Sequence, residues 1–230
     1  SYACGRLTLV DFGFDIDDCV PAAEMTDGDF VTDSIRLPQL SDGKYSRGVV
    51  GLVTGSARYP GAAVLSATAA ARANAGMVRY LGPQRAQDMV LSSLPEAVIG
   101  KGRVQSWVVG SGVPTGDDEA ADTDIQRETI TALLKHYALQ EKTGSNDDAG
   151  NESALGMPPI VVDAGALDLL PGKVPAQVVV TPHAGELARM LTRLDENEAS
   201  VDEVRSQPLA CARRVHELTG ATVLLKGAVT

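Results

Sequence analysis

Side chains that could bind a small polar ligand occur in four turns, each of which follows an apolar, strand-like run. Glycine or proline marks these turns, which span residues 55–61, 110–112, 181–186 and 226–227. Because the carboxyl ends of parallel strands meet at one edge of an open α/β sheet, these turns would lie together where such sheets bind ligands. One such turn alone is typical of a simple connector, whereas the four together indicate a binding site.

Two side chains in these turns can meet a ligand directly. His183 lies between a predicted strand and a predicted helix, where its imidazole can donate to or accept from a ligand. A histidine that bonds only to the nearby backbone is an equally good interpretation. Lys226 ends an apolar strand and is either a point charge for a phosphate or a solvated strand-end lysine. Asp163 and Asp168 can each orient a hydroxyl group, but helix capping is the favoured interpretation of both.

The other candidate groups carry less chemical information. Gly110, Gly112 and Gly116 allow either the close approach of a ligand or a tight turn. His136 and His216 lie within helical patterns and are predicted to be structural, and no two histidines have the spacing of metal ligands. Neither a Walker A motif nor a strict G-x-G-x-x-G pattern occurs. The sequence therefore assigns no residue as a metal ligand.

The turns are positioned by a regular alternation of strand-like and helical segments. In residues 44–81, a β-rich run leads through a glycine turn to an alanine-rich helix, which starts near Gly61 and ends at Gly76 as a left-handed C-cap. The predicted strands span residues 49–54, 77–81, 107–110, 160–163, 178–181 and 222–226, and the predicted helices include residues 119–140, 186–194 and 201–218. Near-continuous apolar strands indicate burial on both faces. The predicted fold class is therefore α/β, with a mostly parallel central sheet and helices on both faces.

Three segments fall outside this alternation. Residues 1–44 are acidic and lack a sustained period apart from one possible strand at 7–12, so we interpret them as a linker or the tail of a preceding unit. Residues 141–157 are small and polar, and are predicted to form a mobile surface loop. The strand at 222–225 is followed by only five residues, so we expect a covering helix beyond Thr230.

Charge and cysteine content limit the classes of function. The 230 residues include 30 acidic and 20 basic ones, giving a net charge of −10, and no basic cluster occurs, so nucleic acid is not an expected partner. Cys4, Cys19 and Cys211 are odd in number and widely separated, which favours a reducing compartment over a disulfide framework. No apolar run is long enough to cross a membrane, and no leader-like segment is found. We therefore expect a cytoplasmic protein without a membrane partner.

The motifs at these turns resemble those of a known enzyme family. In order along the chain they are KYSRGVVGLVTGSARYPGAAVLSATAAARANAGMVRYLG, VVGSGVPTG, PIVVDAGALDLL, VVVTPHAGELARML and TVLLKGAVT. This set is similar to the ADP-dependent NAD(P)H-hydrate dehydratases, which belong to the ribokinase-like superfamily. The resemblance covers about residues 44–230, and implies a ribokinase-like three-layer domain at 45–230. The segment TLVDFGFDID resembles the closing strand of an epimerase domain, so residues 1–44 are expected to be the end of such a domain in a bifunctional protein.

The resemblance also implies roles for particular residues. The hydrated nicotinamide would contact Ala62, Gly112 and His183, and the adenine nucleotide would contact the segment Lys226, Gly227, Ala228, Val229 and Thr230. The chain departs from the family pattern in two places. The usual G-P-G-L-G is here G-S-G-V-P, and the family's G-T-G-D turn, with its catalytic aspartate, has no counterpart before Thr230. The catalytic residue is therefore unassigned.

The implied reaction is that of a carbon–oxygen lyase, which restores NADH or NADPH from the (6S)-hydrate with ADP or ATP and Mg²⁺. Two alternatives remain open at this point: a small-molecule kinase of the hydroxymethylpyrimidine or hydroxyethylthiazole type, and a nucleotide-binding module without catalytic activity. The expected partners are thus the NAD(P)H hydrate and an adenine nucleotide. We also expect a homo-oligomer.

Overall fold

The computed structural model describes residues 28–118, 124–140, 147–195, 198–228 and 230, together with the isolated positions 8, 10, 12, 13, 20, 24 and 26. The chain divides into one compact unit comprising Ser41–Ala228 with Thr230, and another comprising Ser1–Leu40. In the latter, helix α1 (Gly28–Ser34) lies within the segment interpreted as a linker, and was not predicted. The possible strand at 7–12 falls mostly outside the described residues.

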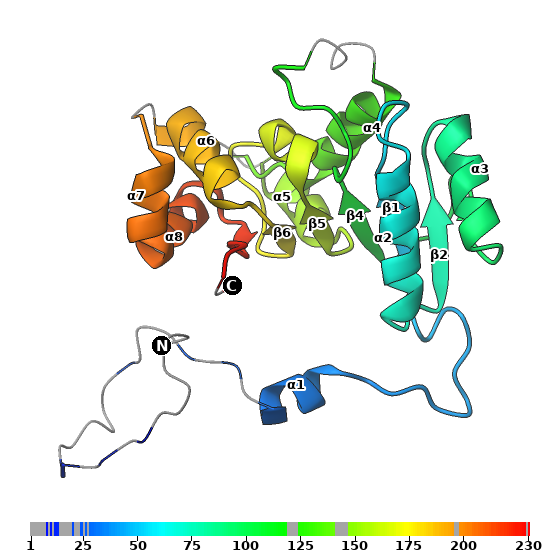
Figure 1. Cartoon of the computed structure of the whole chain (residues 1–230), viewed down its shortest axis with the longest axis horizontal. Coiled ribbons are helices and arrows are strands. Elements are labelled where there is room, and N and C mark those ends of the chain that lie inside the picture. The colour runs from blue at the N-terminus through cyan, green and yellow to red at the C-terminus, as the bar shows by residue number, and fades with distance from the viewer. Residues whose placement is uncertain are drawn as a thin grey trace. The chain divides into compact units, whose positions relative to one another are not determined.

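A seven-stranded sheet forms the centre of the larger unit, and all its neighbouring strands are parallel (Figure 1). The strands are β1 (Val49–Val53), β2 (Met77–Tyr80), β3 (Val98–Ile99), β4 (Ser106–Val109), β5 (Ile160–Val162), β6 (Val178–Val180) and β7 (Thr222–Val223). Their order is β3-β2-β1-β4-β5-β6-β7. All six predicted strands are present, although most are shorter than predicted. Strand β3 was missed because two residues are too few to show an alternating pattern.

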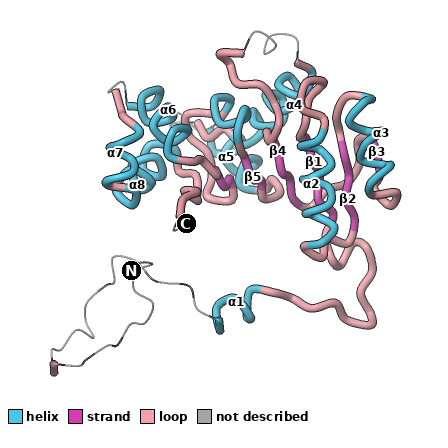
Figure 2. Tube along the Cα trace, in the orientation of Figure 1, coloured by secondary structure: helices cyan, strands magenta, loops and turns pink. Residues whose placement is uncertain are grey.

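Helices lie on both faces of this sheet (Figure 2). They are α2 (Gly61–Arg72), α3 (Gln84–Ser93), α4 (Ile125–Leu134), η2 (Lys135–Tyr137), α5 (Asp147–Leu155), η3 (Ala164–Leu169), α6 (Ala184–Asp195), α7 (Val201–Ser206) and α8 (Pro208–Thr219). The neighbours Leu52 and Val53 in β1 are fully buried in two different core clusters. Leu52 shares one cluster with Ala63 of α2, and Val53 shares the other with Ile130 of α4 and Leu187 of α6. Successive strand residues point to opposite faces, so each face has its own core.

The predicted helix at 186–194 is slightly longer in the structure, as α6, whereas two others differ more. Of the predicted helix at 119–140, residues 119–123 lie outside the described chain, and α4 begins after Asp124, whose carboxylate accepts from the backbone N–H groups of the first turn. The predicted helix at 201–218 is two helices, because Pro208 starts α8 and Gln207 before it is not helical. Proline at the first position of a helix costs no intrahelical hydrogen bond, because an N–H group there would have no partner within the helix.

The predicted surface loop at 141–157 is wrong over Asp147–Leu155, where α5 lies, and residues 141–146 of it fall outside the described residues. Tertiary contacts stabilise this helix. The Asn151 side chain donates to the carbonyl of Gln140 and accepts from its N–H, and Ala154 is buried. The Gln177 amide donates to carbonyls at the end of the helix. Local composition does not reveal such partners.

The turn after α2 also differs in detail from the prediction. Asn74, with φ +71°, is the left-handed residue after the helix, rather than Gly76. Gly76 is required for another reason, since a Cβ atom there would lie 2.2 Å from the carbonyl oxygen of Lys44. In the part of the chain that the structure describes, no helix has both the length and the apolar character needed to span a bilayer.

Candidate active site

The carboxylate of Asp163 joins the turns that follow three other strands. Its Oδ2 accepts from Ser111 Oγ at 2.8 Å, and its Oδ1 accepts from Thr181 Oγ1 at 2.9 Å and from Lys226 Nζ at 2.6 Å. These partners follow β4, β6 and β7, while Asp163 itself follows β5. The predicted capping role is wrong, because Asp163 precedes η3 but its side chain makes no cap hydrogen bond.

The partners of Asp163 keep it ionised. Burial by itself raises the pKa of the Asp163 carboxyl, but the three hydrogen bonds and the charge of Lys226 together hold that pKa below its usual value. An ionised carboxylate next to a lysine supplies a fixed negative charge at the ligand-binding edge of the sheet.

His183 begins the turn into α6 and bonds to the helix start. Its Nδ1 accepts from the backbone N–H of Gly185 at 3.0 Å and of Glu186 at 3.3 Å. Because Nδ1 acts as an acceptor, the proton of the neutral ring is assigned to Nε2. The side chain is 55% exposed, and Nε2 lies 3.6 Å from Glu186 Oε1. The alternative of a backbone-bonded histidine therefore describes Nδ1, while Nε2 makes no bond to the backbone of a described residue and faces the Glu186 carboxylate.

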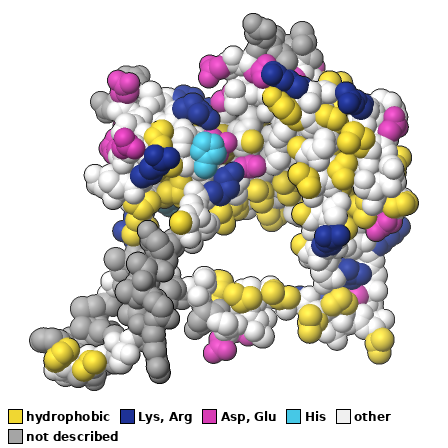
Figure 3. Space-filling model, viewed as in Figure 1, with side chains coloured by type: hydrophobic (Ala, Val, Ile, Leu, Met, Phe, Trp, Pro, Cys, Tyr) yellow, Lys and Arg dark blue, Asp and Glu magenta, His cyan; other side chains and the backbone are white. Residues whose placement is uncertain are grey.

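Glu186 and Lys226 complete this group of charges. Glu186 Oε2 accepts from the backbone N–H of His183 at 2.8 Å and lies 3.8 Å from Lys226 Nζ. The Lys226 backbone N–H donates to the carbonyl of Pro182, so that Lys226 pairs with His183 beyond the ends of β6 and β7. In the space-filling view, an exposed histidine lies beside acidic and basic side chains (Figure 3).

The two glycine turns pack closely against each other. Gly112 has φ +73°, and a Cβ atom there would lie 2.3 Å from the Cβ of Ala62. Gly110 has φ +104°, and a Cβ atom there would lie 2.0 Å from the carbonyl oxygen of Asp163. The N–H of Gly55 donates to the carbonyl of Ser111 at 2.7 Å. Glycine is therefore required on both sides of Ser111. The turn that the two glycines form places the Ser111 hydroxyl next to the Asp163 carboxylate.

Arg127 of α4 anchors the segment that follows Gly112. Its Nη1 donates to the carbonyls of Pro114 at 2.8 Å and Gly165 at 3.1 Å, and to Asp168 Oδ1 at 3.1 Å. Asp168 Oδ2 accepts from the backbone N–H of Gly116 at 2.6 Å. Asp168 therefore holds a loop rather than capping a helix, which corrects the prediction.

The structure brings most of the predicted site residues together through a chain of contacts. Ala62 touches Gly112, whose neighbour Ser111 bonds to Asp163, and Asp163 pairs with Lys226, which in turn pairs with His183. The predicted nucleotide segment continues from Lys226 with exposed residues at 227, 228 and 230, while Val229 lies outside the described residues. Sequence reasoning missed Ser111, Thr181, Glu186 and Arg127. Of these, Glu186 had a usable signal, since a glutamate three residues after a helix-start residue is a capping pattern.

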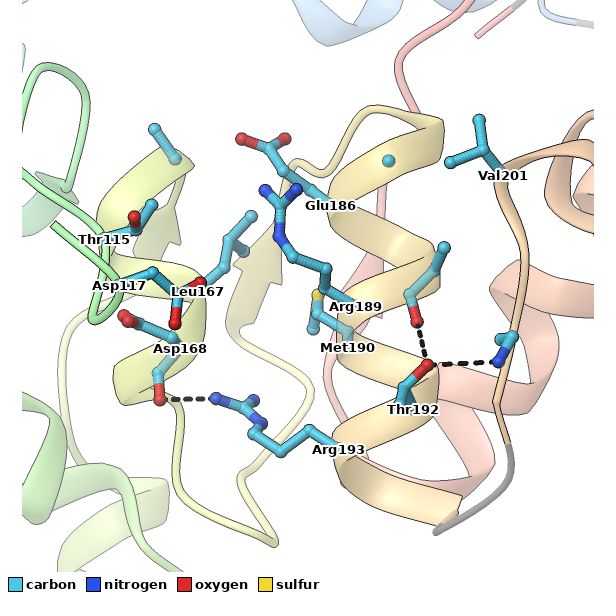
Figure 4. Close-up of a pocket in the computed structure, with 14 residues that line it drawn as sticks. Thr115, Asp117, Leu167, Asp168, Glu186, Arg189, Met190, Thr192, Arg193 and Val201 are labelled. Atoms are coloured by element: carbon cyan, nitrogen blue, oxygen red, sulfur yellow. Dashed lines mark hydrogen bonds between the residues drawn. The ribbon is translucent and has the colours of Figure 1, made fainter.

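A cleft of about 540 Å³ opens beside this cluster, between η3 and α6 (Figure 4). Gly185 and Glu186 belong both to its wall and to the turn that holds His183. The opposite wall includes Thr115 and Asp117, which lie on the segment that follows Gly112.

An all-parallel sheet with helices on its faces and a polar site at its carboxyl edge is an open α/β architecture, and comparison with solved structures narrows the fold. A ribokinase-like superfamily protein from Enterococcus faecalis aligns with a TM-score of 0.61 and 21% identity, over 84% of this chain and 62% of that one. The ADP/ATP-dependent NAD(P)H-hydrate dehydratase from Bacillus subtilis, co-crystallized with ATP/Mg²⁺, aligns with a TM-score of 0.60 and 20% identity, over 86% of this chain and 65% of that one. These likenesses confirm the predicted fold class.

Sequence similarity identifies the family. Residues 50–230 match the model of the NAD(P)H-hydrate dehydratase family, and the chain belongs to that family. The bifunctional NAD(P)H-hydrate repair enzyme Nnr of Mycobacterium tuberculosis is 38% identical over 240 residues, covering 99% of this chain and 42% of the relative. The Nnr enzyme of Corynebacterium glutamicum is 34% identical over 201 residues, covering 81% of this chain and 30% of the relative. The chain thus spans less than half the length of these relatives.

Proposed function

We propose that the protein catalyses the ADP- or ATP-dependent dehydration of hydrated NADH and NADPH, restoring the reduced nucleotide. The observation that carries this proposal is the chain of contacts that links Gly112, Lys226 and His183 through the single carboxylate of Asp163. Membership of the dehydratase family favours this reaction over phosphorylation of a vitamin precursor. The same membership favours an enzyme over a silent binding module.

The hydrated nicotinamide ring is proposed to lie against Ala62, Gly112 and His183. The absence of a side chain at Gly112 lets a ring approach the backbone closely. The Nε2–H of His183 can donate a hydrogen bond to the hydroxyl or carboxamide oxygen of the substrate, since Nδ1 is already occupied by the helix start. The turn residues would thus form a surface that fits the nicotinamide ring, and His183 would orient the ring through a hydrogen bond.

The adenine nucleotide is proposed to contact Lys226, Gly227, Ala228, Val229 and Thr230. The Lys226 side chain is 41% exposed and can offer its ammonium group to a phosphate. Mg²⁺ prefers carboxylate oxygens as ligands. Glu186 and Asp163 are the carboxylates within 4 Å of the lysine that would meet the phosphates, so these two residues would hold the ion together with its waters. Bound there, Mg²⁺ would shield the phosphate charges.

The chemistry proceeds by converting a poor leaving group into a good one. Transfer of the terminal phosphoryl group of the nucleotide to the C6 hydroxyl gives a phosphate ester at C6. Phosphate then departs as the ring nitrogen donates its electron pair, and loss of a proton from C5 forms the C5=C6 double bond. The residues assigned above contribute positioning and charge stabilisation. No general base is assigned among these 230 residues.

The proposal is tested by incubating the full-length protein with hydrated NADH and ADP while following the near-ultraviolet absorbance of reduced nicotinamide. A nucleotide-dependent rise in absorbance supports the dehydratase. Consumption of ATP with hydroxymethylpyrimidine or hydroxyethylthiazole, and no rise with the hydrate, identifies the kinase alternative. Nucleotide binding without either reaction identifies the binding module.

We also propose a domain organisation and a setting for the protein. Residues 45–230 are assigned to the dehydratase domain, and residues 1–44 to the end of a preceding epimerase domain, which the names and the 99% coverage of the bifunctional relatives support. The odd, separated cysteines support a cytoplasmic location. A homo-oligomeric state is proposed as well, and sedimentation of the full-length protein tests it.

A further inference from the structure

The cleft between η3 and α6 has the composition of a site for a ring that carries a phosphate. Its volume of about 540 Å³ lies within the range of roughly 300–1,000 Å³ for small-molecule sites. Its inner surface includes the buried apolar side chains of Leu167, Ala188 and Met190. Charged side chains stand at its rim, so an apolar base could lie on the inner surface with polar substituents toward the rim.

One cation of the cleft is available to a ligand. Arg189 projects from α6 into the space facing η3 (Figure 4), is exposed, and makes no hydrogen bond or ion pair with any residue that the structure describes. The second arginine, Arg193, donates to the carbonyl of Asp168. Among the acids, Asp168 is held by Arg127 and Gly116, and Glu186 accepts from the His183 backbone. A ligand phosphate would therefore find its positive partner in Arg189.

The position of the cleft indicates which ligand it takes. Thr115 and Asp117 lie three and five residues beyond Gly112, and Gly185 and Glu186 lie two and three beyond His183. The cleft therefore begins where two of the proposed nicotinamide contacts end. Of the residues proposed for ADP or ATP that the structure describes, 226–228 and 230, none lines it.

We propose that this cleft binds the adenosine half of the hydrated dinucleotide, with one of its phosphates at Arg189. The inference rests on the proposed function and extends it, because it assigns a site to the part of the substrate that does not react. Binding energy from that remote half would orient the nicotinamide ring at the reacting centre. The Asp117 carboxylate at the rim can accept hydrogen bonds from ribose hydroxyls.

The test compares a dinucleotide with a mononucleotide substrate in the full-length protein. Arg189→Gln should lower kcat/KM for hydrated NADPH about tenfold or more, and leave kcat/KM for hydrated reduced nicotinamide mononucleotide within about twofold of wild type. Arg189→Lys should recover part of the loss, and Arg85→Gln, a change of an exposed arginine on α3, should have no effect. A loss for NADPH hydrate that exceeds the loss for NADH hydrate points to the 2′-phosphate, and equal losses point to the pyrophosphate; either supports the cleft.

Three results would overturn the inference: equal losses with the dinucleotide and the mononucleotide, no loss with the dinucleotide, or a weakened Kd for ADP in Arg189→Gln. Equilibrium binding of NADPH itself, followed by its fluorescence, separates this inference from the proposed function. If the wild type dehydrates nothing but Arg189→Gln still weakens NADPH binding, the cleft stands and the dehydratase fails. If the wild type is active and Arg189→Gln behaves as wild type in both measurements, the dehydratase stands and the cleft fails.

Discussion

Lys226 Nζ lies 2.6 Å from Asp163 Oδ1, and this ion pair joins the turn after the edge strand β7 to the turn after β5, two strands away. The same carboxylate accepts hydrogen bonds from Ser111 and Thr181, so that one side chain organises the ends of four strands. The proposed substrate and nucleotide residues extend from this carboxylate in both directions along the sheet edge.

Removing the charge of Asp163 should destabilise the protein. Asp163→Asn keeps an acceptor oxygen but leaves Lys226 only the more distant carboxylate of Glu186, and we expect a loss of about 1–3 kcal/mol in the free energy of unfolding. Denaturant unfolding of both proteins measures it. Asp195→Asn, which removes the partner of the exposed Arg214, is the matched control and should cost about 1 kcal/mol or less. Equal losses in the free energy of unfolding would show that Asp163 contributes no more to stability than the Asp195–Arg214 ion pair does.

The lowered pKa of Asp163 predicts a particular dependence of stability on pH. In the unfolded chain this group titrates near its ordinary value of 3.8, and in the folded protein it titrates below that. Between these values the unfolded state binds more protons, so stability rises with pH. The contribution is complete above the unfolded pKa, and is lost as pH falls through the lowered folded value. Unfolding curves from neutral to acidic pH should show a smaller acid-induced loss in Asp163→Asn than in wild type. Superimposable pH profiles would contradict this.

His183 is expected to serve both the helix and the substrate, and two substitutions separate these roles. Asn at position 183 can still accept the N–H groups at the start of α6, whereas Ala cannot. Both variants should lose about tenfold or more in repair rate, since neither has the imidazole Nε2–H. Only His183→Ala should also lose about 0.5–2 kcal/mol of stability, the usual cost of removing a helix cap. An Asn variant with wild-type activity would remove His183 from the substrate site.

Gly112 and Ala62 should be energetically coupled. Gly112→Ala places a Cβ atom 2.3 Å from that of Ala62 on a backbone with φ +73°, so we expect destabilisation by about 1–3 kcal/mol or more. Combining it with Ala62→Gly removes the overlap but not the unfavourable backbone conformation, so the double variant should recover part of the loss. A double-mutant cycle from chemical unfolding gives the coupling energy, expected at about 0.5–3 kcal/mol. Strict additivity would mean that the two turns are not in contact.

The fold was largely predictable because strands and turns leave local signals. Apolar runs and the glycine- or proline-marked turns after them located β1, β2, β4, β5, β6 and β7, and the parallel arrangement followed from burial on both faces. Elements with weak local patterns were missed, such as β3, which has two residues, and α5, which depends on the side chains of Asn151 and Gln177. Their stability comes from tertiary contacts that composition does not encode.

The candidate site was predictable only in part, for the same reason. Gly112, His183 and Lys226 follow predicted strands, so the pattern of strands and turns was sufficient to locate them. The roles of Asp163 and Arg127 depend on distant partners: Lys226 is 63 residues from Asp163, and Asp168 is 41 residues from Arg127. No spacing within one segment indicates such pairs, so local reasoning assigned Asp163 to helix capping.

The most direct test of the account is the stoichiometry of the repair reaction. Phosphate release and the absorbance of reduced nicotinamide are measured together while the full-length protein acts on hydrated NADH and ADP. The account predicts one phosphate released for each NADH restored, and no NADH without nucleotide. Restoration of NADH without nucleotide, or phosphate release without NADH, would contradict the claim that the protein couples nucleotide cleavage to dehydration.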